Sequence, residues 1–179
     1  MTTQRAQRLT RNDWLVAGAD VLATKGAEAL KAEPMARHLK TTKGSFYWHF
    51  KDVPDFHAQV LDRWETAALA AMRDLPETGH VAQLRSLAQA FAAPPQNHSP
   101  ETAIRAWATA HDGALATVAR VDTSRLDALQ ALLAQTGIGN PEMARIIYAA
   151  AIGMAVLDKS EGDDQTAIGS LVDLVLALR

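Results

Sequence analysis

A run of ten residues, 42–51 (TKGSFYWHFK), carries side chains suited to contact with nucleic acid. It combines hydroxyl groups, cations and a glycine with five aromatic or imidazole rings. Phe46 and Phe50 are four residues apart and share one face of a helix, so the three rings between them must point elsewhere. Exposed hydrogen-bonding rings beside cations fit a surface that touches phosphates and base edges. The alternative is an aromatic core helix that happens to be basic.

The residues before this run predict how it is positioned. Residues 34–39 (PMARHL) form a short helical pattern with Met35 and Leu39 on one face, and residues 40–42 (KTT) form a turn. Two short helices joined by a short turn, the second of them basic, are the helix-turn-helix arrangement. This context favours contact with DNA over the aromatic core helix.

Residues of about 10–56 resemble the DNA-binding domain of the tetracycline-repressor (TetR) family of bacterial transcription regulators. The landmarks of the resemblance are Leu9, Thr10, Arg11, Gly26, Met35, Ala36, Leu39 and the run 43–50. It implies an all-α fold of about nine helices, with a three-helix N-terminal helix-turn-helix domain and a C-terminal helical domain for ligand binding and dimerisation. We expect these domains at residues 1–52 and 53–179.

The first domain is therefore expected to bind a double-stranded DNA operator. Hydroxyl groups and cations would bond phosphates or base edges, a glycine would let the backbone come close, and the exposed rings would clamp the sugar-phosphate wall. The N-terminal arm, with Arg5 and Arg8, either reaches DNA or frays as a solvated terminus. The predicted DNA-contacting residues are Thr10, Arg11, Lys40, Thr42, Lys43, Gly44, Ser45, Tyr47, Trp48, His49 and Lys51.

Three positions depart from the family pattern. Lys40 stands where the turn usually has glycine, so it is expected in a left-handed backbone conformation. Lys31 replaces the usual hydroxyl cap of the second helix. Val53 stands where a lysine commonly contacts phosphate, and Lys51 is the candidate to replace that contact.

Charge is distributed unevenly along a chain whose net charge is only −2. Residues 1–51 hold nine Lys or Arg and four Asp or Glu, a net of +5, whereas residues 52–179 hold nine and sixteen, a net of −7. A basic segment followed by an acidic one fits a part that meets a polyanion and a part that does not.

Composition excludes several kinds of chemistry and location. The chain has no cysteine, which excludes disulfides, zinc-thiolate sites and thiol catalysis. The N-terminus lacks the apolar core of a signal peptide. The longest apolar run, 146–157, is shorter than the roughly 20 residues that span a bilayer. We expect a cytoplasmic protein.

Helical periodicity continues beyond the basic segment. It predicts an N-terminal helix at about 11–24 and later helices at about 53–73, 81–92, 101–110, 113–135, 142–159 and 164–178. The helix at 113–135 is expected to be interrupted near Asp122, and residues 93–100 form the clearest loop. No segment alternates as a strand.

Two C-terminal helices predict an assembly. The helix at 142–159 is apolar on nearly all sides between residues 146 and 157, and the last helix carries an almost uninterrupted apolar stripe. These surfaces either complete the core of one chain or form a two-fold, four-helix interface. The resemblance favours a homodimer that reads a pseudo-palindromic operator. The candidate interface residues are Ala150, Gly153, Met154, Ile168, Leu171, Val172 and Val175.

The histidines do not support enzyme chemistry. Six are scattered along the chain, without the spacing of metal ligands. The sequence also lacks a glycine-rich phosphate loop and a Gly-x-Ser-x-Gly elbow. We expect no enzymatic activity, no metal and no cofactor.

The resemblance, rather than the residues, implies an unidentified small-molecule effector in the C-terminal domain. The chain would then be a repressor released from its operator by that ligand. The alternative is an effector-independent architectural or nucleoid-associated DNA-binding protein of the same fold. Release of DNA by an effector distinguishes the two. The candidate lining residues, which are equally ordinary core residues, are Trp64, Phe91, Trp107, His111, Met143 and Tyr148.

Overall fold

Helices form all the regular secondary structure in the parts of the chain that the computed structural model describes, which are residues 9–70, 72–73, 79–92, 100–154, 156–157 and 164–177. The all-α prediction is confirmed, with nine α-helices in these parts. They are α1 Arg11–Lys25, α2 Ala32–His38, α3 Lys43–His49, α4 Val53–Ala70, α5 His80–Ala92, α6 Glu101–Ala108, α7 Asp112–Gln135, α8 Pro141–Met154 and α9 Asp164–Ala177, with a short 3₁₀ turn, η1, at Ala27–Ala29.

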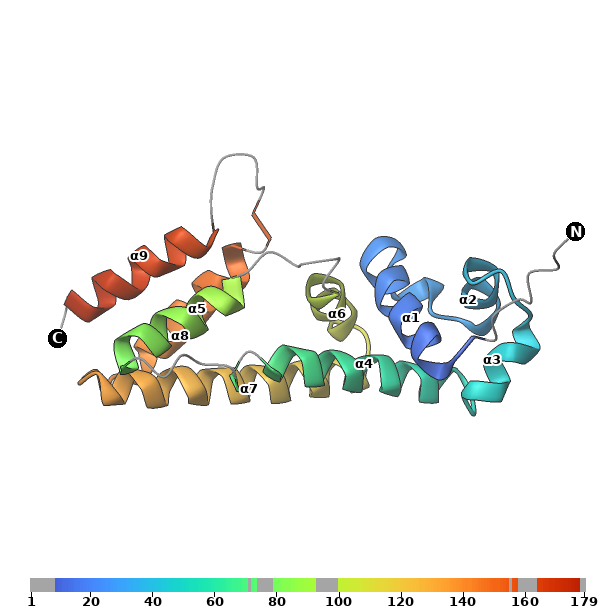
Figure 1. Cartoon of the computed structure of the whole chain (residues 1–179), viewed down its shortest axis with the longest axis horizontal. Helices are drawn as coiled ribbons and strands as arrows, with labels where there is room; N and C mark the ends of the chain where they lie inside the picture. The colour runs from blue at the N-terminus through green and yellow to red at the C-terminus, as the bar shows by residue number, and fades with distance from the viewer. Residues whose placement is uncertain are drawn as a thin grey trace, which may run out of the picture.

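The helices form two groups joined by long helices (Figure 1). We call α1, η1, α2 and α3 the head and the helices from α4 onward the body. The head lies at one end, and α4 runs from it alongside α7. The helices α5, α8 and α9 gather at the other end, where α5 packs on both α8 and α9. The short helix α6 packs on α7 and also on α1 of the head.

The first helix begins and ends as the sequence predicts. Thr10 is its N-cap, and the Thr10 hydroxyl accepts a hydrogen bond from the Asp13 amide while the Asp13 carboxylate accepts one from the Thr10 amide at 2.7 Å. This reciprocal pair satisfies amides that the first turn leaves free. Gly26 ends the helix with a φ of 78°, a conformation that glycine adopts without steric cost.

An aromatic core holds the head to the start of α4. Trp14 and Phe46 are fully buried with ring centroids 5.5 Å apart, and Phe56 of α4 lies 5.3 Å from Phe46. Gly18 allows the close crossing, since a Cβ at this position would lie 2.7 Å from the Phe56 ring. The helix α3 therefore packs on an aromatic core that includes the first turns of α4.

The packing of the chain does not divide at residue 52. The aromatic core of the head continues along α4 to Trp64 and Ala68, and it takes in Ile104 of α6 and Val121 of α7. A second core unites α5, α8 and α9 with the second half of α7. The expected domain boundary at residue 52 stays a prediction, and the head is packed continuously against the first half of the body.

Some helix boundaries differ from the predicted ones. The helix α4 ends at Ala70, and α8 ends at Met154. The interruption predicted near Asp122 is wrong, because α7 is continuous from Asp112 to Gln135. The Asp122 carboxylate accepts hydrogen bonds from Arg105 and Tyr148. It therefore does not compete for its own backbone, which is how aspartate usually weakens a helix.

No helix within the described residues combines the length and the apolar character needed to cross a membrane.

Candidate nucleic-acid interface

A tight turn sets the angle between α2 and α3. After Leu39, Lys40 adopts a φ of 52°, which confirms the left-handed conformation expected at this position. The Thr41 amide then donates to the Ala36 carbonyl at 2.9 Å. Thr42 is the N-cap of α3, and its hydroxyl accepts a hydrogen bond from the Ser45 amide at 3.3 Å. Turn and cap together fix where the third helix begins.

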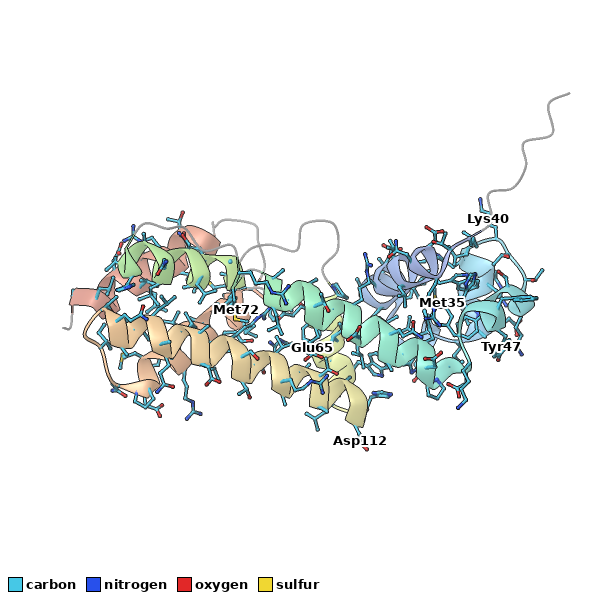
Figure 2. All side chains as sticks on the ribbon, turned by 60° about the horizontal axis from the view of Figure 1, so that its bottom comes forward. Met35, Lys40, Tyr47, Glu65, Met72 and Asp112 are labelled. Atoms are coloured by element: carbon cyan, nitrogen blue, oxygen red, sulfur yellow. The ribbon has the colours of Figure 1, made fainter. Side chains whose placement is uncertain are left out.

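The third helix has a buried face and an exposed face, as its ring spacing predicts. Phe46 is 0% and Phe50 is 1% exposed, whereas Tyr47 is 49% and Trp48 is 80% exposed. Figure 2 shows Tyr47 and Lys40 at the outer end of the head, directed away from its interior. Large aromatic side chains so exposed on a monomer mark a contact surface.

Cations surround this exposed face. Lys40, Lys43 and Lys51 are exposed. Lys31 and Arg37 form exposed ion pairs with glutamates of their own segment, at 3.0 and 3.2 Å. Such pairs contribute little to stability, so these cations can exchange their partners for phosphates. An open hollow of about 530 Å³ separates α2 from α3 and is lined by Lys31, Ala32, Glu33, Pro34, Arg37, Lys43, Tyr47 and Val53.

Three of the predicted DNA-contacting residues also contact other parts of the chain, and their contact with DNA stays a prediction. The Thr10 hydroxyl donates to Asp13 at 2.7 Å. The Arg11 guanidinium donates to the backbone carbonyl of His49 at 2.6 Å. The His49 ring is half-buried and lies 6.4 Å from the Trp14 ring. The contacts of Arg11 and His49 join positions far apart in the chain, so spacing along the sequence could not reveal them, whereas Thr10 and Asp13 are three residues apart.

The remaining predicted positions are arranged around α3. Gly44 is exposed, and a Cβ there would lie 3.7 Å from the Thr42 hydroxyl, an ordinary distance, so packing within the chain does not require glycine. Ser45 is half-buried. Lys31 is the N-cap of α2 without a side-chain cap bond, as its substitution for a hydroxyl residue predicts. The arm with Arg5 and Arg8 lies outside the described residues.

The candidate effector residues belong to two separate clusters. Trp64 is in the core shared with the head, and the Trp107 ring lies 4.4 Å from that of His111. The other three, Phe91, Met143 and Tyr148, belong to the second core, where the Phe91 and Tyr148 rings are 5.6 Å apart. That these six residues line one ligand site stays a prediction.

A partly buried charge network, with Arg125 as its most buried member, lies where these two clusters meet. Both oxygens of the Glu101 carboxylate accept hydrogen bonds from Arg125, at 2.8 and 3.2 Å, and Arg105 donates to Glu101 at 2.9 Å. Arg105 also bonds Asp122 at 2.7 Å, and the Tyr148 hydroxyl donates to the same carboxylate at 2.7 Å. The network links α6, α7 and α8, and it was not predicted from the sequence.

The network alters the acidity of its members. Burial, together with the hydrogen bond to Asp122, raises the pKa of Tyr148 to about 12. Burial alone would raise the pKa of Asp122, but the hydrogen bonds from Arg105 and Tyr148 outweigh it and lower that pKa. The carboxylate therefore stays ionised and the phenol neutral near pH 7, and the network keeps two cations matched by two anions.

A separate polar contact lies at the junction between the head and the body. His57 of α4 lies with its Nε2 atom 2.8 Å from the carbonyl oxygen of Leu30, in the segment before α2. Burial lowers the pKa of His57. The neutral imidazole therefore donates to the Leu30 carbonyl at pH 7 and ties α4 to the head.

Three of the residues predicted for the dimer interface are buried within the single chain, and the interface itself stays a prediction. Ile168, Val172 and Val175 are at most 4% exposed and lie in the second core of the single chain. The apolar stripe predicted along the last helix therefore faces the chain's own interior and leaves these side chains no surface for a second copy. Ala150, Met154 and Leu171 are half-buried, and Gly153 is exposed.

Fold and surface together define a class of structure, a helix-turn-helix head with an exposed basic and aromatic face followed by a helical body. A model of the family described as bacterial regulatory proteins, tetR family, matches residues 15–52. No curated protein matches the chain significantly.

Solved structures match over almost the whole chain. A putative TetR-family transcriptional regulator from Rhodococcus sp. has a TM-score of 0.75 at 16% identity, covering 93% of this chain and 98% of its own. A transcriptional regulator from Rhodococcus sp. Rha1 has a TM-score of 0.77 at 19% identity, covering 94% of this chain and 97% of its own. The ketosteroid transcriptional regulator KstR2 of Mycobacterium tuberculosis has a TM-score of 0.70 at 16% identity, and the match covers 97% of each chain.

Residues 15–52 therefore match the TetR-family model, and the whole chain has the fold of TetR-family regulators of known structure.

Proposed function

We propose that α3 reads a specific operator in the major groove of DNA. The observation that carries this proposal is the division of α3 into a buried face, with Phe46 and Phe50, and a face with the exposed rings of Tyr47 and Trp48. A helix anchored in this way presents polar rings and cations to DNA without moving its own core. Lys43, at its first turn, is placed to bond guanine acceptors or a phosphate.

Replacing Lys43 by methionine tests this assignment. The operator is first identified by selecting bound sequences from random duplex DNA. We expect Lys43→Met to weaken operator binding about tenfold, the scale of one lost charged contact, and to reduce the salt slope of binding by about one. Fluorescence anisotropy at several salt concentrations measures both quantities.

The matched control is Arg120→Met, which also removes one exposed cation but on α7 in the body, outside the dimer interface proposed below. It should bind the operator like the parent protein. If Lys43→Met did so too, α3 would not be the helix that reads DNA.

We further propose that the chain acts as a homodimer through the outward faces of α8 and α9. On α8, Ile146 is 47% exposed and the space beside Gly153 is open, and Leu157, just beyond the end of this helix, is 62% exposed. On α9, Leu174 is 62% exposed. The two helices pack on each other, so their apolar faces adjoin. Small residues between the large ones let a second pair of helices approach closely, as in a two-fold four-helix interface.

A small-molecule effector is proposed to release the protein from its operator, which makes the chain a ligand-controlled repressor. The support is the connection between body and head. Arg125, inside the body, donates to the Ala68 carbonyl near the end of α4, and α6 packs on α1. A ligand that displaces either α4 or α6 would change the separation of the two α3 helices in a dimer. That separation must match about one turn of DNA.

Reciprocal binding tests the effector proposal. A ligand found by screening for thermal stabilisation is titrated by calorimetry with and without operator DNA. Because coupling is reciprocal, we expect the operator to weaken ligand binding by the factor by which the ligand weakens operator binding, about 5- to 150-fold. Equal affinities in the two titrations would mean that the molecule is no effector. A protein without any releasing ligand would fit the architectural alternative.

A further inference from the structure

The side chain of Arg11 joins the start of α1 to the far end of α3. Its Nε and Nη2 atoms both donate to the backbone carbonyl of His49, at 3.1 and 2.6 Å, although 38 residues separate the two positions. The guanidinium carbon lies 5.6 Å from the centroid of the Phe50 ring. Two of the five N–H groups of Arg11 and one face of its guanidinium are therefore committed to the end of α3.

The end of α3 needs such a partner. The helix has only seven residues, and a helix of this length is marginal in isolation. Its last carbonyls have no partner within the helix, and together they form the negative end of the helix dipole. A guanidinium that donates twice to the His49 carbonyl satisfies one of these acceptors and places a positive charge where the dipole favours it.

Arg11 is itself held in a fixed position. It is the first residue of α1, directly after the N-cap Thr10 and its reciprocal hydrogen bonds with Asp13. One turn further, Trp14 packs beneath the same region, 5.5 Å from the Phe46 ring. The start of α1 therefore contacts α3 twice. Trp14 packs on its buried face, and Arg11 bonds its C-terminal end.

We propose that Arg11 is a positioning residue for DNA recognition: it fixes the C-terminal end of α3, and with it the direction of the exposed Trp48, rather than neutralising a phosphate. This inference rests on the proposed role of α3 as the helix that reads DNA. A positioning residue affects discrimination between sequences. A phosphate contact instead affects all duplexes alike, because phosphates carry no sequence information.

The variant Arg11→Met separates the two roles, since it keeps the aliphatic stem and removes both the charge and the donors. We expect operator affinity to fall about tenfold, the scale of a charge-assisted hydrogen bond, while affinity for an unrelated duplex stays within about twofold. We also expect the salt slope to stay at the parent value. A phosphate contact would instead weaken both duplexes equally and lower the slope by about one, as expected for Lys43→Met.

Amide hydrogen exchange provides a readout that general destabilisation does not reproduce. The Phe50 amide donates to the Phe46 carbonyl at the end of α3, and the Gly26 amide donates to the Leu22 carbonyl at the end of α1. In Arg11→Met, we expect exchange of the Phe50 amide to accelerate about tenfold and that of the Gly26 amide to stay unchanged. Equal acceleration at both amides would indicate a general structural role and overturn the proposal.

Two further variants complete the experiment. Arg11→Lys keeps the charge but loses the two-donor fork, so we expect a partial loss of discrimination, whereas a phosphate contact would tolerate it. Arg63→Met removes another cation that bonds α1, through Asn12 at 2.8 Å, and should leave DNA binding unchanged.

The result with Lys43→Met separates the two possible failures. If Lys43→Met weakens operator binding and Arg11→Met does not, the proposal for Arg11 is wrong and α3 still reads DNA. If neither variant weakens binding, α3 is not the reading helix and both proposals are wrong.

Discussion

Replacing Glu101 by glutamine is expected to destabilise the protein by about 3 kcal/mol, since removal of one partner of a buried ion pair typically costs 3–5 kcal/mol. The side chain of Arg125 is 6% exposed, and that of Glu101 is 22% exposed. We place the cost near the lower limit because about a fifth of Glu101 reaches solvent. The variant leaves the Arg125 cation buried, with the more distant Asp122 as the remaining anion of the network.

Urea denaturation followed by circular dichroism measures this cost, and the matched control is Asp173→Asn. Asp173 forms an exposed ion pair with Arg85, so its loss should cost less than about 1 kcal/mol. The double variant Glu101→Gln, Arg125→Met removes the buried cation as well. Its destabilisation should be smaller than the sum of the two single effects by about 2 kcal/mol. Additive effects, or a Glu101→Gln cost no larger than that of the control, would contradict the importance of the network.

The head could be predicted in detail because its signals are local. The ring spacing identified the buried Phe46 and Phe50 and the exposed Tyr47 and Trp48, and each of these four assignments agrees with the structure. The left-handed conformation of Lys40 was expected from the resemblance, because the family usually has glycine at this position of the turn. Capping residues, turns and helical periodicity act over three or four residues, so a single sequence contains them in full.

The contacts that join the parts of the chain could not be predicted. Arg11 meets the His49 carbonyl and Arg125 meets Glu101 across long stretches of sequence. An arginine in a helix is ordinarily predicted to be solvent-exposed, and the positions of Arg11 and Arg125 along the sequence do not indicate which residue each of them contacts. Pairing over such distances depends on how whole helices pack, which periodicity does not encode.

The last helix shows a related limit. Its apolar stripe was correctly located along the sequence, but Ile168 and Val172 face the core of the same chain. Periodicity identifies an apolar face and cannot say whether the same chain or a second copy covers it. Among the described residues of α9, one large apolar side chain, Leu174, is mostly exposed on the outward face, which therefore gave a weaker signal.

A charge placed at Leu174, on the outward face of α9, is expected to have the second large effect. Leu174→Asp should convert the proposed homodimer to a monomer at low micromolar concentration. Two-fold symmetry places the new carboxylate on both sides of the interface, and burial of unpaired charge in an apolar contact is costly. Because Leu174 is 62% exposed in the single chain, the substitution should leave the fold of each monomer unchanged. Light scattering coupled to size exclusion measures the mass, and circular dichroism verifies the fold.

The matched control is Leu115→Asp on α7, where a leucine is 55% exposed outside the proposed interface. This variant should remain a dimer. The monomer formed by Leu174→Asp should also lose operator affinity by about 100-fold or more, because two linked heads bind two half-sites with a high effective concentration and a single head does not. A parent protein that is itself a monomer at these concentrations would refute the interface. Retention of both the dimer and full operator affinity by Leu174→Asp would show that the contact lies on another surface of the body.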